Sequence, residues 1–78
     1  MRILFFAQLR GAVGSDHGEV DANGVNQTEL WRLLEERWPS LSAHRATTRL
    51  ARNGAYAGPE DMFRSADEVA LIPPVSGG

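Results

Sequence analysis

The segment from Asn26 to Pro39 carries the strongest structural signal in the chain. Asn26 suits a helix N-cap, and Glu29 three residues later completes a capping box. Apolar residues then recur at helical spacing until Pro39 ends the pattern. These apolar residues are Leu30, Leu33, Leu34 and Trp38. The sequence therefore predicts one amphipathic helix of about three turns, whose apolar stripe the rest of the chain must cover.

The residues before this helix have the character of strands. Residues 2–8 form a short run that is apolar on both faces. Alternation places Ile3, Phe5 and Ala7 on one face, and Leu4, Phe6 and Gln8 on the other. Residues 10–16 are small and polar, as in a turn or a single helical turn, and residues 17–21 are expected to form a second strand.

The residues after the helix contain a hairpin signal at Asn53-Gly54. With a loop at 40–46, residues 47–52 and 55–57 become its two strands. A two-residue turn sets Ala51 opposite Tyr56, so Tyr56 points outward if Leu50 belongs to the core. Residues 69–72 form the last strand, with Ala70 and Ile72 on one face and Val69 and Leu71 on the other. Met62 and Phe63 are expected in the core.

The element order predicts a mixed sheet covered on one side by a single helix. This is an α+β fold of the β-grasp kind, with a domain at 1–72 and an extended tail at 73–78. The chain of 78 residues has no cysteine, and its two histidines lie far apart. Neither a disulfide nor a structural metal is therefore expected, and the apolar core must supply the stability.

The charge pattern narrows the classes of partner. Ten acidic residues and eight arginines give a net charge of −2, which lacks the basic footprint of a nucleic-acid binder. The apolar run near the amino terminus is interrupted by Gln8 and Arg10, too early for a signal peptide or a membrane span. We therefore expect a cytoplasmic protein. Because the chain contains no lysine, it offers no side-chain amine for a polymer of itself.

The last six residues, 73–78, read PPVSGG. Pro73 and Pro74 stop the final strand and favour an extended path, and Gly77 and Gly78 have no side chain to block entry into a narrow channel. The chain itself has no phosphate-binding glycine motif, no cysteine nucleophile and no Ser-His-Asp set. A self-contained active site is therefore not expected, and the terminal carboxylate becomes the candidate reactive group.

Two motifs resemble those of the small subunit of molybdopterin synthase. They are LFFAQLR at residues 4–10 and DEVALIPPVSGG at residues 67–78, whereas residues 14–48 match only in pattern. The resemblance implies a ubiquitin-like sulfur carrier. In that family an E1-like adenylyltransferase activates the terminal glycine, here Gly78, with ATP, and a sulfur donor system converts it to a thiocarboxylate. The carrier itself binds no cofactor stably.

The resemblance also implies the sulfur acceptor and the partners. The sulfur passes to cyclic pyranopterin monophosphate inside a heterotetrameric synthase, whose large subunit receives the tail and supplies most of the pocket. The apolar sheet face would contact both that subunit and the activating enzyme. Alternation offers Phe6, Tyr56 and Ile72 for this face, with a buried core position as the alternative for Phe6 and Ile72. Arg10 is a candidate to pair with a partner carboxylate, or an exposed, solvated side chain. The remaining candidates for partner contact are Pro73, Pro74, Val75 and Ser76.

Two other functions stay open at this point. Carriers for the thiazole of thiamine share the fold and the terminal Gly-Gly, although the sequences at 4–8 and 73–75 favour the molybdenum-cofactor branch. A ubiquitin-like modifier would instead join Gly78 to lysines of other proteins.

Overall fold

The computed structural model describes residues 1–74 and contains one five-stranded mixed sheet. Its strand order is β2-β1-β5-β3-β4, with β1 and β5 parallel and the other pairs antiparallel. The elements are β1 (Arg2–Phe5), α1 (Gln8–Val13), β2 (His17–Glu19), α2 (Gln27–Arg37), the 3₁₀ helix η1 (Pro39–Thr47), β3 (Arg49–Arg52), β4 (Ala55–Tyr56) and β5 (Glu68–Ile72). The predicted β-grasp arrangement is confirmed.

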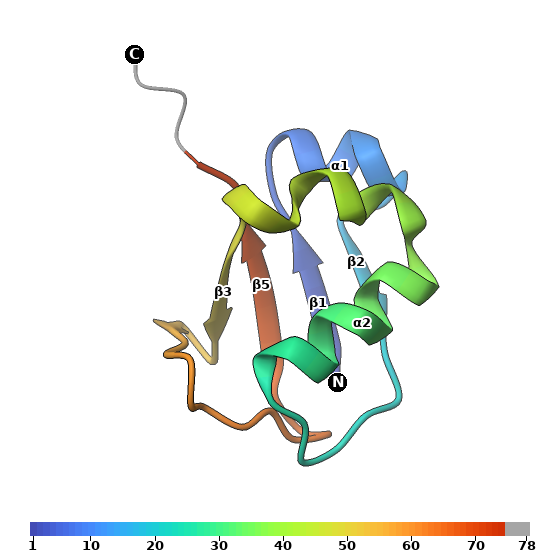
Figure 1. Ribbon diagram of the computed structural model, residues 1–78. Coiled ribbons are helices and arrows are strands. Elements are labelled where there is room, and N and C mark those ends of the chain that lie inside the picture. The colour runs from blue at the N-terminus through green and yellow to red at the C-terminus, as the bar shows by residue number, and fades with distance from the viewer. Residues whose placement is uncertain (75–78) are drawn as a thin grey trace.

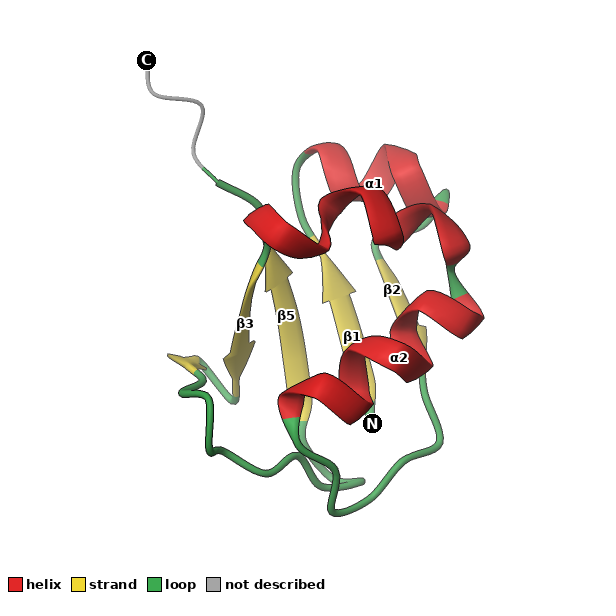
Figure 2. Cartoon of the chain, viewed as in Figure 1, coloured by secondary structure: helices red, strands yellow, loops and turns green. Residues whose placement is uncertain are grey.

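Helix α2 covers one face of this sheet (Figure 1). Figure 2 shows the helices gathered on that side, while β1 and β5 form the centre of the sheet beneath them. The parallel β1 and β5 end at the same edge, so the segment after Phe5 and the segment after Ile72 leave the sheet together. Within residues 1–74, no helix is both long and apolar enough to cross a bilayer.

The predicted capping box of α2 is present. The Asn26 side chain accepts a hydrogen bond from the backbone N–H of Glu29 at 2.8 Å, and the Glu29 carboxylate accepts one from the backbone of Asn26 at 3.1 Å. Leu30 and Leu34 are fully buried, as the helical spacing predicts, whereas Leu33 is only half-buried. Trp31, which the spacing did not single out, is 5% exposed.

The core lies between α2 and the covered face of the sheet. Ile3, Phe5, Val69 and Leu71 point into it and are at most 1% exposed. The rings of Phe5 and Trp38 meet edge to face with centroids 4.9 Å apart. Trp38 also reaches β2, where a Cβ added to Gly18 would lie 2.3 Å from its ring, so only glycine fits there.

Several local predictions are wrong. The first strand ends at Phe5, because Ala7 adopts a positive φ of 51° where the chain turns into α1, and Ala7 is exposed rather than buried. The predicted loop at 40–46 is part of η1, which buries Leu41 completely. Met62 is 43% exposed, because its neighbour Phe63 takes the core position and pairs through its backbone with Val25.

The turn and register of the hairpin form as predicted, but its strands are shorter than the predicted 47–52 and 55–57, because Thr47 belongs to η1 and β4 ends at Tyr56. Asn53 and Gly54 both have positive φ, at 51° and 88°, which is the geometry of a tight hairpin turn. Ala51 lies opposite Tyr56, and the backbone of Ala57 donates to the carbonyl of Leu50 at 2.9 Å. This register fixes which residues of β3 and β4 share a face.

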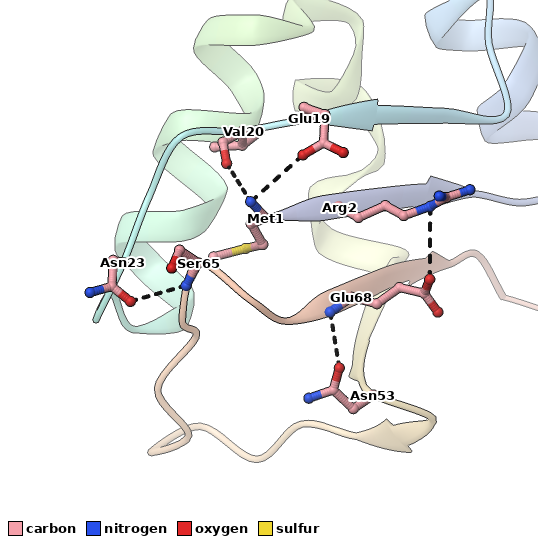
Figure 3. A network of polar contacts seen from close by, with 8 residues as sticks. All are labelled: Met1, Arg2, Glu19, Val20, Asn23, Asn53, Ser65 and Glu68. Carbon is pink, nitrogen blue, oxygen red and sulfur yellow. Dashed lines mark hydrogen bonds and ion pairs between the residues drawn. The ribbon is translucent and has the colours of Figure 1, made fainter.

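The sheet end near Met1 is held by polar contacts (Figure 3). The Met1 amino group donates to the carbonyl of Val20 at 3.0 Å, and the Asn53 side chain accepts from the backbone of Glu68 at 2.9 Å. Asn23 accepts from the backbone of Ser65 at 3.0 Å, which joins the loops that flank this end. The end that leads to the tail is the opposite one.

Candidate functional site

The sheet face opposite α2 carries apolar side chains that no helix covers. Alternation turns Leu4 of β1 and Ala70 of β5 away from the core, and the strand register sets the two side by side. Ala51 of β3 lies beside Ala70, and Tyr56 of β4 lies beside Ala51. We call this surface the open face, defined by Leu4, Ala51, Tyr56, Ala70 and Ile72 with Phe6 at its edge.

The predicted docking residues lie at the tail end of the open face. Phe6 is 46% exposed and Tyr56 is 57% exposed, so neither is a core residue. The sequence left open whether Ile72 is a surface residue or a buried core residue. In the structure it is half-buried, so it is neither fully exposed nor fully buried. Large aromatic side chains that remain this exposed in the isolated domain can be buried by a partner, and exposed apolar side chains of this kind are typical of a binding face.

Phe6 and Arg10 lie together at one side of this edge. They line a shallow pocket of about 230 Å³ whose wall also includes Leu4 and His17. The His17 ring lies 2.7 Å from the Asp16 carboxylate, and this hydrogen bond lowers the pKa of Asp16. Arg10 makes no ion pair with any residue in the range 1–74, so its charge is available to a partner there.

A second pocket of about 230 Å³ lies at the root of the tail. It is lined by Thr47, Arg49, Tyr56, Ile72, Pro73 and Pro74. The structure thus brings together Tyr56, Ile72 and the two prolines, four of the predicted contact residues. Pro73 is buried and Pro74 is exposed, so the chain leaves the body of the protein between them.

Thr47 and Arg49 are the residues of this pocket that the sequence did not single out, and Arg49 is the charged one. Its guanidinium carbon lies 4.1 Å from the centre of the Tyr56 ring, a stacking distance for a cation and an aromatic face. The predicted hairpin register was sufficient to place Arg49 beside Tyr56. Because Ala51 lies opposite Tyr56, the residue two positions earlier, Arg49, falls diagonal to Tyr56 on the same face.

Another pocket, of about 410 Å³, lies elsewhere, beside the hairpin turn. Its wall carries two arginines, Arg52 and Arg64, and three carboxylates, those of Glu60, Asp61 and Asp67, so charges of both signs lie side by side in it. The backbone of Arg64 and then the side chain of Asn53 donate hydrogen bonds to Asp67 and lower its pKa. These contacts join the turn to the loop before β5, which points to a structural role.

The reactive end of the predicted tail lies beyond the described residues, since Val75, Ser76, Gly77 and Gly78 are all outside them. Within residues 1–74, no group of three or more His, Cys, Asp or Glu side chains is placed to hold a metal ion. The described part of the chain therefore offers a face and an edge for contact, arranged around the point where the tail begins.

Comparison with known proteins places this architecture among small carriers and modifiers. A model described as the ThiS family matches residues 3–78. A protein of Caenorhabditis briggsae named molybdopterin synthase sulfur carrier subunit is 35% identical over 81 residues, which cover 100% of this chain and 96% of that protein.

Two solved structures are similar along nearly the whole chain. The crystal structure of SAMP1 from Haloferax volcanii has a TM-score of 0.85 and 30% identity, covering 100% of this chain and 98% of that one. The other is a complex of subunits 1 and 2 of the molybdopterin-converting factor from Helicobacter pylori, with a TM-score of 0.69 and 19% identity. It covers 99% of this chain and 96% of the matched chain, and at that identity it supports the fold alone.

Proposed function

Because the chain belongs to the ThiS family, we propose that it is a sulfur carrier whose Gly78 carboxylate is adenylated, converted to a thiocarboxylate and used to make the molybdopterin dithiolene. The observation that carries this proposal is the full-length similarity to proteins named molybdopterin synthase sulfur carrier subunit. The name of these relatives also favours the molybdenum-cofactor branch over the thiamine-thiazole branch.

The chemistry of the tail fits this role. A carboxylate is a poor electrophile, so sulfur displaces its oxygen only after a good leaving group is attached. Transfer of AMP from ATP forms an acyl phosphate anhydride with release of pyrophosphate. A sulfide equivalent (HS⁻) from the donor system then attacks the carbonyl carbon and AMP leaves, which gives the thiocarboxylate without a change of oxidation state. An E1-like adenylyltransferase would supply the ATP site, and the carrier itself would hold no cofactor.

The two glycines have separate tasks in this scheme. Gly78 carries the activated carboxyl group and then the sulfur. Gly77, which has no Cβ, would let the tail pass through a channel too narrow for a side chain. Val75 and Ser76 would line the path between the channel and the body of the carrier.

The open face and the tail root would form the surface that partners grip. Phe6, Tyr56 and Ile72 offer apolar area, and Arg10 offers a charge for a carboxylate of the partner. Pro73 and Pro74 stiffen the start of the tail, which reduces the conformational freedom lost when a partner takes it up. The same surface would serve the activating enzyme and the large subunit in turn, so their binding would be mutually exclusive.

The large subunit of molybdopterin synthase is the partner proposed for sulfur transfer. The related Helicobacter pylori structure is described as a complex of subunits 1 and 2 of the molybdopterin-converting factor. For this chain we propose a heterotetramer in the cytoplasm, with two carriers that each deliver a sulfur to cyclic pyranopterin monophosphate.

Reconstitution tests this function directly. Thiocarboxylated carrier, the large subunit and cyclic pyranopterin monophosphate are mixed, and molybdopterin is measured. The wild-type carrier should yield molybdopterin, and a variant that lacks Gly78 should yield none while keeping its melting temperature. Failure of the thiocarboxylated wild type to form any molybdopterin would eliminate the molybdenum-cofactor branch.

Protein modification is the second candidate, and the likeness to SAMP1 favours it, since another structure of that protein is described as small archaeal modifier protein 1. Conjugation would join Gly78 to lysines of other proteins and produce adducts of higher mass on those targets. A carrier alone would show only the exchange of oxygen for sulfur. Mass analysis of protein from the native host separates the two.

A further inference from the structure

We infer that Arg49, held against the ring of Tyr56, makes the pocket at the tail root a receptor for an apolar side chain and a neighbouring carboxylate of the large subunit. This inference rests on the proposed function and adds a specificity residue to it. The pocket is the one lined by Thr47, Arg49, Tyr56, Ile72, Pro73 and Pro74.

The size and wall of this pocket suit a protein side chain. Its volume of about 230 Å³ lies below the roughly 300–1,000 Å³ typical of pockets for small-molecule ligands. Tyr56, Ile72 and the two prolines supply an apolar wall, and Arg49 supplies the one cationic group in it. A partner segment with an aliphatic side chain next to a carboxylate would pack against the apolar wall and pair with Arg49 at the same time.

The charge of Arg49 is not balanced within the described part of the chain. Arg2, on the same face, lies 3.8 Å from Glu68, and His17 lies 2.7 Å from Asp16. Arg49 makes no such ion pair with residues 1–74. Next to the tail, the open face therefore carries a positive charge, that of Arg49, which is free to pair with a carboxylate of a partner.

The stack on Tyr56 prepares Arg49 for this contact. A guanidinium that lies over a ring keeps its N–H groups at the edge, where they can fork to a carboxylate. The ring also limits the rotamers of a long side chain, so less conformational freedom is lost on binding. Register supports the placement, because Arg49 pairs with Ile72, the last residue before the tail.

The pocket adjoins the path of the tail, which identifies the partner as a protein that takes the tail up. Pro73 and Pro74 belong both to the pocket wall and to the start of the tail. A protein that encloses residues beyond Pro74 would lie next to the pocket wall that Pro74 shares with Arg49. The acidic and apolar segment therefore belongs to the rim of the tail channel.

Binding of the large subunit to defined variants tests this inference. Arg49→Gln should weaken the complex roughly tenfold, and Arg49→Lys should recover part of that loss because it keeps the charge without the planar fork. Tyr56→Leu, which keeps an apolar wall but removes the stack, should fall between wild type and Arg49→Gln. Calorimetric titration at two salt concentrations measures the affinities, and the Arg49→Gln complex should depend less on salt.

The matched control is Arg37→Gln. Arg37 is also exposed and also lies over an aromatic ring, 4.8 Å from the centre of Trp38, but it lies on the helical side. Its variant should bind like wild type. Equal affinities for Arg49→Gln and Arg37→Gln, with wild type active in sulfur transfer, would overturn this inference and leave the proposed function standing. A wild-type carrier that neither binds the large subunit nor transfers sulfur would remove both.

Discussion

The two faces of the sheet differ in what covers them, although neighbouring residues of the same chain segments build both. On the covered face, Phe5 and Leu71 are buried beneath α2 and are at most 1% exposed. On the open face, Phe6 and Tyr56 are about half exposed, at 46% and 57%. The covered face therefore supplies the stability of the domain, and the open face is the surface that we propose for partners.

The neighbours Phe5 and Phe6 give the sharpest test of this division. Phe5→Ala should lower the free energy of unfolding by about 3–5 kcal/mol, because it leaves a cavity beside Trp38 in a small core. Phe6→Ala should cost less than about 1 kcal/mol, because the ring is already partly in water. Urea unfolding of both variants measures the difference.

In partner binding the order of the two effects should reverse, so that Phe6→Ala has the larger effect on affinity. Phe6→Ala should weaken binding of the large subunit roughly tenfold, as loss of an aromatic anchor does. Under conditions where Phe5→Ala is still folded, it should bind nearly as well as wild type. A Phe6→Ala variant that loses as much stability as Phe5→Ala would erase the distinction between the faces.

The contact between Gly18 and Trp38 tests how tightly the covered face is packed at its edge. Gly18→Ala should destabilise by about 1–3 kcal/mol, because its Cβ would lie 2.3 Å from the indole ring. Gly11→Ala is the control, since a Cβ there meets nothing within 4 Å and a helical glycine gains from the change. If both variants melted together, Trp38 would not seal this edge.

The capping box tests whether α2 contributes stability without contributing to binding. Asn26→Ala removes the acceptor for the backbone of Glu29 and should cost about 1 kcal/mol. Thr28→Ala, at an exposed position of the same turn, should cost less. Affinity for the large subunit should stay at the wild-type value, and a lower affinity would mean that partners also contact the helical side.

Asp67 gives the smallest effect, visible only in acid. Hydrogen bonds from the backbone of Arg64 and from Asn53 lower its pKa below the usual value, so the carboxylate stabilises the folded state above about pH 4. That contribution is lost as the pH falls through the lowered pKa. Asp67→Asn should therefore lose some stability near pH 7 and show a flatter acid response. Identical melting temperatures for both proteins at every pH would contradict this.

The parts of the fold that depend on local signals were predicted from the sequence. The capping box at Asn26 and the Asn53-Gly54 turn each rest on a few consecutive residues, and both form as predicted. Once the turn was known, the outward position of Tyr56 followed from alternation. The family motifs at the two ends of the chain were likewise readable without a structure.

The parts that depend on tertiary packing were not predicted. Residues 40–46 show no helical spacing of apolar residues. They nevertheless form part of η1, because Leu41 packs into the core and is buried there. Ala7 leaves the strand pattern because the chain must turn sharply into α1. Arg49 was not predicted as a site residue because its position depends on tertiary contacts. It stacks on Tyr56 across the hairpin and lines the pocket at the tail root.

The central claim is that the carboxyl group of Gly78 is the reactive group and that the folded domain delivers it. Intact-mass spectrometry of the chain isolated from its own host, followed by fragmentation, tests this most directly. The account predicts a population whose mass increase equals one oxygen replaced by sulfur, located at Gly78. A terminal carboxylate that stays unmodified during active molybdopterin synthesis would contradict it.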